Sequence, residues 1–241
     1  MIPKIIHYCW FGNKEKPENV KKYIQSWKET LSDYQIIEWN EDNFPIDYCR
    51  YSKEAYENGK YAFVSDVARL YALKKYGGIY FDTDIEVLRN FDSYLADSRM
   101  VVSYESNKLL MTGFFAAEAN CEVISDLLKE YNNREFVKSD GSLNMTANTV
   151  YMTNCLMNFD VKRDVVGSKT TSGIRVYDFT TFGAFDADNS TFEISEKTVL
   201  VHHCLASWSS KEFQVMFKIK RFAASIAGGV AYKFLRKVLK K

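Results

Sequence analysis

The stretch Tyr76–Glu86, YGGIYFDTDIE, decides how this chain is interpreted. A Gly-Gly turn leads into the apolar, β-type run Ile79–Phe81, and that run ends in two carboxylates, Asp82 and Asp84. Aspartates two positions apart on a strand point to the same side, so their charges repel unless a cation lies between them. We therefore interpret them as ligands of a hard divalent cation, Mg²⁺ or Mn²⁺. The alternative is that Asp82 caps a turn while Asp84 lies on an exposed face.

The elements around this stretch predict an α/β domain. Strands are expected at Lys4–Cys9 and Gln35–Trp39, with a helix over Pro17–Thr30 between them. A nearly continuous apolar helix starts at Ala62 and is closed by Gly77 as a left-handed C-cap. Further strands are predicted at 79–81, 99–104, 114–117, 175–179 and 198–203, and further helices at 52–58, 122–131 and 148–158. In such a sheet, ligands collect at the carboxyl ends of the strands, where Asp82 and Asp84 stand.

Two polar residues interrupt the apolar helix before the Gly-Gly turn. Asp66 and Arg69 are three positions apart and therefore share one helix face. They form either a buried ion pair or a pocket for a polyhydroxy substrate, in which Asp66 accepts hydrogen bonds from hydroxyls and Arg69 donates them. The two arrangements are compatible with each other. A second Asp-x-Asp, at Asp186 and Asp188, has no strand leading into it and is interpreted as a solvated turn in the loop 182–190.

Composition sets further limits. With 241 residues, 46% of them apolar, the chain can bury one core, and its net charge of +1 gives no reason to expect a nucleic-acid partner. The five cysteines form no Cys-x-x-Cys pair, which argues against a disulfide framework and favours a reducing cytosol. No apolar run is long enough to span a membrane, and the N-terminus lacks a signal-peptide pattern. We therefore expect a cytoplasmic protein.

The C-terminal segment 211–241 differs from the rest. It holds nine Lys and Arg residues against one acid, Glu212, and mixes them with Phe, Ile and Val at helical spacing. We expect a catalytic domain over 1–210 and a basic amphipathic helical segment over 211–241 that lies on the inner face of the membrane and contacts anionic lipid. The alternative is a helical pair packed on the domain, with its lysines solvated.

Three segments together carry a family resemblance: IPKIIHYCWFG from Ile2, SDVARLYALKKYGGIYFDTD from Ser65, and HHCLASW from His202. They resemble the DXD-containing sugar transferases of glycosyltransferase family 32, which include capsular-polysaccharide transferases. The resemblance implies a GT-A-like fold, a Rossmann-like mixed sheet flanked by helices, that binds a nucleotide sugar. It also implies a metal-dependent, retaining hexosyltransferase that uses Mn²⁺ or Mg²⁺ and a nucleotide-sugar donor, taken as a UDP-sugar. The implied acceptor is a glycan or lipid-linked oligosaccharide in cell-surface polysaccharide synthesis.

The resemblance also implies roles for individual residues. Catalytic roles fall on Asp66, Arg69 and Asp84. The cation would be held by Asp84, His203 and Asp82. Donor contacts are implied for Ile6, His7, Trp10, Asp66, Arg69, Asp82, Ser207 and Trp208. Adjacent strand residues face opposite ways, so only one of His202 and His203 can be a ligand. His203 is favoured here, and His202 stays open.

Other readings remain at this point. The family often has a Gly-Pro pair before a helix in its acceptor region, whereas this chain has Met145-Thr146-Ala147-Asn148, so the acceptor contacts there stay open. A catalytically inactive glycan- or nucleotide-binding module at the membrane is the main alternative. A metal-dependent hydrolase built on the same carboxylates is disfavoured, because no evident general base accompanies them.

Overall fold

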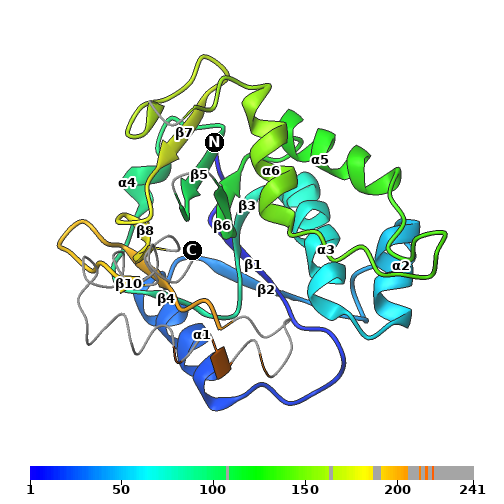
Figure 1. Cartoon of the computed structure of the whole chain (residues 1–241). Coiled ribbons are helices and arrows are strands. Elements are labelled where there is room, and N and C mark those ends of the chain that lie inside the picture. The colour runs from blue at the N-terminus through cyan, green and yellow to red at the C-terminus, as the bar shows by residue number, and fades with distance from the viewer. Residues whose placement is uncertain are drawn as a thin grey trace, which may run out of the picture.

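The computed structural model shows a central sheet with helices on both faces (Figure 1). It describes residues 1–106, 109–162, 165–186 and 191–205, and the single residues 212, 215, 216 and 219. The basic segment 211–241 and the residues Ser207 and Trp208 thus lie outside the described part, except for those four single positions. Within the described residues, no helix is both long and apolar enough to cross a membrane.

The main sheet has six strands in the order β2-β1-β3-β6-β5-β7. Strand β6 is antiparallel to both of its neighbours, and every other neighbouring pair is parallel. Strands β1, β3, β5 and β7 therefore run in the same direction, and their carboxyl ends lie along one edge of the sheet. The strands are β1 (Ile5–Cys9), β2 (Gln35–Trp39), β3 (Gly78–Phe81), β5 (Met100–Tyr104), β6 (Leu110–Ala117) and β7 (Ile174–Tyr177).

A smaller sheet stands beside that edge. Its strands are β4 (Ile85–Val87), β11 (Leu200–His202) and β8 (Phe182–Gly183), with β11 in the middle. Strand β11 is antiparallel to β4, and His202 is paired with Ile85. The late part of the chain is thereby brought against the turn that follows β3. A short hairpin joins β9 (Phe185–Asp186) to β10 (Thr191–Phe192).

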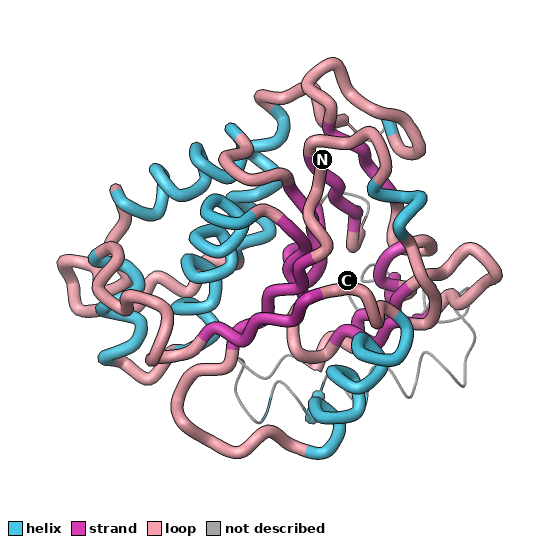
Figure 2. Tube along the Cα trace, turned by 180° about the vertical axis from the view of Figure 1, so that it is seen from behind, coloured by secondary structure: helices cyan, strands magenta, loops and turns pink. Residues whose placement is uncertain are grey.

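The helices fall into two groups on opposite faces of the main sheet; Figure 1 shows the first at the right, and of the second it shows α1 at the bottom and α4 at the left. The first group is α2 (Arg50–Glu57), α3 (Tyr61–Tyr76), α5 (Glu122–Asn132) and α6 (Asn148–Met157). The second is α1 (Glu18–Thr30) and the short α4 (Asp92–Leu95). Figure 2 shows from behind that the strands run through the centre between them.

Alternation along the strands divides the buried side chains into two cores. In β3, Tyr80 faces the core under α2, α3, α5 and α6, whereas Ile79 and Phe81 face the core under α1. The α1 core is rich in aromatic rings, most of them in edge-to-face or tilted pairs, and Phe114 lies parallel to Phe182 with ring centroids 4.3 Å apart. Because side chains on both faces of β3 are packed in a core, the end of this strand is held in position. The polar residues that follow it, Asp82 and Asp84, are therefore held in position as well.

The α/β architecture expected from the sequence is confirmed, with corrections at particular elements. The predicted strand 114–117 begins four residues earlier, at Leu110. Gly77 ends α3 with a φ of 65° and a ψ of −167°, so its φ is positive but it is not a left-handed cap. The segment expected to be the loop 182–190 contains β8 and β9. Asp186 is buried and paired with Thr191 in the hairpin, so this aspartate does not lie in a solvated turn.

Candidate functional site

A cavity of about 560 Å³ opens at the carboxyl edge of the main sheet. Residues that follow three parallel strands line it: Trp10 after β1, Asp82 after β3 and Glu105 after β5. Helix α3 contributes Asp66 and Arg69, and β11 contributes His202. Cavities of this size are typical of small-molecule sites, and this edge is where open α/β sheets bind ligands.

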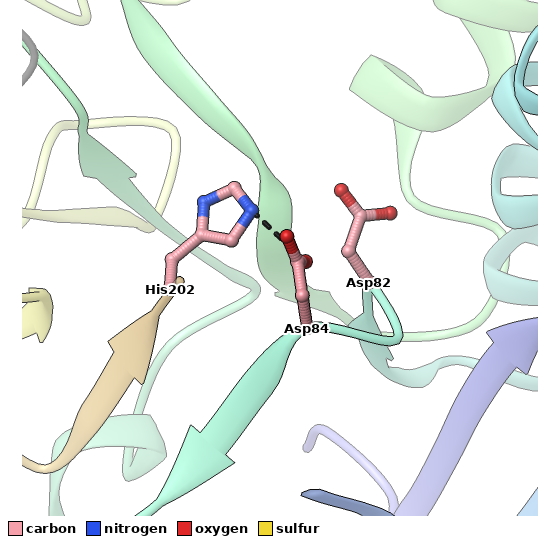
Figure 3. A group of neighbouring side chains, drawn as sticks. All are labelled: Asp82, Asp84 and His202. Carbon is pink, nitrogen blue, oxygen red and sulfur yellow. Dashed lines mark ion pairs between the residues drawn. The ribbon is translucent and has the colours of Figure 1, made fainter. Parts of the chain in front are cut away.

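The two aspartates of the opening motif converge with His202. One ligand atom from each of Asp82, Asp84 and His202 lies within 4.8 Å of the others. Figure 3 shows His202 and Asp84 pointing toward each other, with Asp82 beside them. The His202 Nε2 atom is 3.2 Å from Asp84 Oδ1. The backbone N–H of Leu205 donates to Asp84 Oδ2 at 2.8 Å, which fixes the carboxylate from its other side.

The sequence suggested that Asp82 and Asp84 lie on one strand, and the structure corrects this. Strand β3 ends at Phe81, and the aspartates stand on the turn between β3 and β4. They converge because β4 leaves this turn to pair with β11, and the backbone N–H of His203 donates to the carbonyl of Asp84 at 3.0 Å. The turn is therefore fastened to β11 at the point where His202 ends that strand.

These residues fit a divalent cation. His202 turns its Nε2 toward Asp84, and its other ring nitrogen, Nδ1, is buried without a hydrogen-bond partner among the described residues. The gap between the ligands is kept open by Gly113 in β6, because a Cβ there would lie 2.8 Å from His202 Cε1 and 3.1 Å from Asp82 Oδ2. Two carboxylates and one imidazole suit Mn²⁺ or Mg²⁺.

The charges in this group depend on one another. Burial opposes ionisation of Asp84, but His202 and the Leu205 N–H outweigh it and hold the pKa of Asp84 below its usual value. Burial likewise opposes the imidazolium, while Cys204 and Asp84 raise the pKa of His202 well above its usual value. A cation between these groups would replace the proton on His202, because metal ligation needs the neutral ring.

The expectation that His203 completes the metal shell is corrected by this geometry. His203 points away from the aspartates, where its Nε2 is 2.8 Å from Glu86 Oε2 and its ring stacks on Tyr23 with centroids 4.6 Å apart. The physical reason is the alternation along β11, which turns His202 and His203 to opposite sides. Of the two histidines between which the sequence left the choice open, the structure brings His202, and not His203, beside the two aspartates.

Asp66 and Arg69 form the buried ion pair that was one of their two expected arrangements. Arg69 Nη2 is 3.1 Å from Asp66 Oδ1 and 3.4 Å from Asp82 Oδ1, and Arg69 Nη1 donates to the carbonyl of Thr112 at 2.7 Å. Burial raises the pKa of Asp66 to about 7, although Arg69 lowers it. Both side chains also line the cavity, so the pair can contact a ligand bound there.

Sequence reasoning missed two polar residues in this cavity. Asn148, at the start of α6, donates from Nδ2 to Asp66 Oδ1 at 2.6 Å and accepts from the Thr112 hydroxyl at 2.8 Å. Glu105 is half-buried at the end of β5, and burial raises its pKa to about 7 despite the lowering effect of His202. The only signal for Glu105 was its place immediately after a predicted strand that ends at Tyr104.

The predicted donor residues at the first strand are divided between cavity and core. Trp10 lines the cavity, and its indole N–H donates to the carbonyl of Lys14. Ile6 and His7 are fully buried and are not among the lining residues. His7 accepts at Nδ1 from Trp39 Nε1, and its Nε2 therefore carries the proton that it donates to the carbonyl of Gly77. The structure does not bring Ile6 or His7 to the cavity, because both faces of β1 are buried: Ile6 points into the α1 core and His7 points to the opposite face, toward Trp39.

Comparisons with known proteins agree with this geometry. Residues 17–101, which contain Asp66, Arg69, Asp82 and Asp84, match the family described as "Glycosyltransferase sugar-binding region containing DXD motif". The resemblance to the DXD sugar transferases is therefore confirmed over residues 17–101, the part of the chain that is similar to such a sugar-binding region.

Individual relatives match parts of the chain. An uncharacterized glycosyltransferase of Acanthamoeba polyphaga mimivirus is 26% identical over 62% of this chain and 61% of its own length. Inositol phosphoceramide mannosyltransferase 3 of Schizosaccharomyces pombe is 32% identical over 39% of this chain and 27% of its own length. The chain thus spans less than two thirds of either relative.

A solved structure shares the fold. The PaToxG glycosyltransferase superposes with a TM-score of 0.50 at 20% sequence identity, over 65% of this chain and 68% of that one. The mixed sheet flanked by helices is therefore the GT-A-like fold that the sequence predicted.

Proposed function

We propose that this protein is a metal-dependent glycosyltransferase that moves a hexose from a nucleotide sugar to a glycan or glycolipid acceptor. One observation carries the proposal: Asp82, Asp84 and His202 share a single cavity with the buried pair Asp66 and Arg69. The three potential cation ligands stand where a diphosphate can be bound, and the ion pair stands beside them, where sugar hydroxyls can be bound.

Breaking the bond between the anomeric carbon and the diphosphate leaves negative charge on the leaving group. A divalent cation held by Asp82, Asp84 and His202 would supply Lewis-acid stabilisation of that charge. The remaining work falls to the protein's own side chains. Arg69 offers fixed N–H donors, and Asp66 accepts hydroxyl protons, so the two can orient the donor sugar without reorganising. Trp10 offers an aromatic face at the nucleotide end of the cavity.

Finer features of the proposal rest on the family resemblance and the relatives. Retention of configuration and a UDP-sugar donor come from the resemblance. The Schizosaccharomyces pombe relative is an inositol phosphoceramide mannosyltransferase, so a mannose donor is included in the test. Roles of Ser207 and Trp208 in closing over the diphosphate stay predictions, because both residues lie outside the described part of the chain.

The cellular setting is proposed from the sequence. The basic, amphipathic segment 211–241 favours an enzyme that works at the inner face of the membrane, where lipid-linked oligosaccharides of capsule type are assembled. In that setting the acceptor and the enzyme share one surface.

The test is nucleotide-sugar turnover by the full chain with MnCl₂, using UDP-glucose, UDP-galactose and GDP-mannose, with and without a mixture of oligosaccharide acceptors. We expect release of nucleotide diphosphate from one donor, faster with acceptor. Asp84→Asn should lower this rate about a hundredfold or more. The control is Asp47→Asn, because Asp47 is exposed, lies in a turn before α2 and is far from the Asp-x-Asp motif in sequence.

Three outcomes decide between the readings. Turnover that needs Mn²⁺ and Asp84 supports the transferase. Donor binding without turnover would indicate the inactive module, and turnover that is never increased by an acceptor would indicate a hydrolase. Near-normal turnover by Asp84→Asn would contradict the metal role.

A further inference from the structure

The Glu105 carboxylate lines the cavity but has no role in the proposed function. It lines the cavity from the end of β5, and no described side chain donates a hydrogen bond to it or forms an ion pair with it. Half-buried carboxylates are costly unless they are hydrogen-bonded, so an unpartnered one that faces a cavity suggests a ligand.

The sheet order gives Glu105 a defined place relative to the other cavity residues. Strands β1, β3 and β5 are parallel, and β6 lies between β3 and β5. Neighbouring strands are separated by about 4.8 Å, so the end of β5 lies about 10 Å from the end of β3, on the side away from β1. Trp10 and Glu105 therefore flank the aspartate turn from opposite sides.

This separation argues against a role for Glu105 in holding the cation. The group whose ligand atoms lie within 4.8 Å of one another contains Asp82, Asp84 and His202, and Glu105 is not a member of it. If the nucleotide occupies the Trp10 side and the diphosphate the aspartates, the Glu105 side is left for the second substrate.

Apolar side chains that line the same cavity come from the elements near the end of β5. Met111 is the second residue of β6, Phe179 follows β7 by two residues, and Phe185 lies in β9; all three line the cavity. Gly183 lies beside Met111, since a Cβ there would make ordinary van der Waals contact with the Met111 Sδ atom at 3.5 Å. An apolar wall with a single polar group that fixes orientation is the usual construction of a ligand subsite.

We propose that Glu105 and Phe179 form the acceptor subsite, in which the Glu105 carboxylate accepts a hydrogen bond from a hydroxyl of a neutral acceptor sugar whose ring packs against Phe179. This inference rests on the proposed function and specifies its second substrate. A sugar with a phosphate at the bound position is disfavoured there, because its charge would repel Glu105, Asp82 and Asp84 together.

The test measures sugar binding to the full chain by saturation-transfer NMR in the presence of Mg²⁺ and the nucleotide diphosphate. The probes are methyl α-mannoside, methyl α-glucoside, methyl β-galactoside and mannose 6-phosphate. We expect at least one neutral glycoside to bind the wild type better than the phosphorylated sugar. Glu105→Gln should weaken its binding by about tenfold to a hundredfold, the loss expected for a hydrogen bond to a charged group. Phe179→Ala should also weaken it, and the exposed Glu57→Gln of α2 should not.

A second measurement separates the acceptor role from a donor role. The increase in melting temperature caused by Mg²⁺ and nucleotide diphosphate should be the same in Glu105→Gln as in the wild type. The proposal is overturned if no neutral glycoside binds, if Glu105→Gln binds it as the wild type does, if the phosphorylated sugar binds better, or if the nucleotide-induced increase is lost with Glu105. None of these results bears on donor turnover, which the proposed function predicts in its own assay.

Discussion

Single residues of the site combine structural and chemical roles, and Arg69 is the clearest case. Its guanidinium is buried between Asp66 and Asp82 and donates to the carbonyl of Thr112. Removing one member of a buried ion pair leaves the others uncompensated, and the cost is about 3–5 kcal/mol of unfolding free energy. We therefore expect Arg69→Ala to lose that stability in urea denaturation and also to lose transfer activity by orders of magnitude.

Arg50→Ala is the matched control for Arg69→Ala. Arg50 pairs with Glu54 and Glu135 on the surface, with 58% of its side chain exposed, so its loss should change the unfolding free energy far less than the loss of Arg69. If Arg69→Ala lowers stability but leaves the turnover of the folded fraction intact, Arg69 is a structural ion pair and does not hold the donor.

The raised pKa of Asp66 predicts a pH dependence of stability. Its pKa is about 7 in the folded chain and near 3.8 when unfolded, so the folded state binds this proton more tightly. The stabilisation is complete below the unfolded value and is lost as pH rises through the folded value. Between these limits Asp66 alone makes the free energy of unfolding fall with rising pH.

Asp66→Asn isolates this contribution, because asparagine resembles the protonated acid at every pH. Unfolding free energies of the wild type and the variant, compared at about pH 4.5 and about pH 8, should shift in favour of the variant at the higher pH. A difference that stays constant with pH, or that shifts in favour of the wild type, would show that Arg69 holds the pKa of Asp66 low.

At the scale of secondary-structure elements, strand β6 helps to position the candidate metal ligands because it has a glycine, Gly113, where they converge. Gly113 lies where a Cβ would contact both His202 and Asp82. We expect Gly113→Ala to push these two ligands apart and to weaken Mn²⁺ binding by about tenfold or more, measured calorimetrically with nucleotide diphosphate present. Gly113→Ala should still fold, because the new methyl group meets side chains and not backbone.

Gly167→Ala is the control for Gly113→Ala. A Cβ at Gly167 would meet nothing within 4 Å, but its φ of 82° disfavours alanine. This variant should lose about 1 kcal/mol of stability and keep its Mn²⁺ affinity. Equal Mn²⁺ affinities in the two variants would mean that the space at Gly113 is not needed for the cation site.

Local pattern predicted the elements well where hydrophobic periodicity is strong. The strand Gln35–Trp39 and the start of α5 at Glu122 were predicted at the observed residues. The aspartate turn was also found, because a Gly-Gly turn, an apolar strand and paired acids form a local signal. The choice between His202 and His203 could not be made, since it depends on the register between β11 and β4, which are far apart in sequence.

Other site residues were invisible for the same reason. Asn148 reaches Asp66 only because α6 packs near α3, and the separation between them is 82 residues. Glu105 becomes part of the cavity only because β5 is parallel to β3 across an antiparallel β6. Sheet order and crossovers are properties of the whole chain, so no local motif carries them. Conversely, His7 belongs to the N-terminal segment that carries the family resemblance, yet its ring bridges Trp39 and the Gly77 carbonyl by hydrogen bonds in the interior.

At the scale of the whole molecule, basic residues are concentrated in the C-terminal segment, and this distribution of charge predicts membrane binding. The segment 211–241 carries nine basic residues against one acid, whereas the cavity is lined by carboxylates. Each basic residue near an anionic surface contributes about 1 kcal/mol, so the full chain should pellet with vesicles of phosphatidylglycerol and phosphatidylcholine, and added salt should release it. A chain ending at Ser210 should stay in the supernatant and retain turnover of a water-soluble donor. Equal pelleting of the two chains would contradict a membrane role for this segment, whereas loss of donor turnover on truncation would mean that the segment completes the catalytic domain.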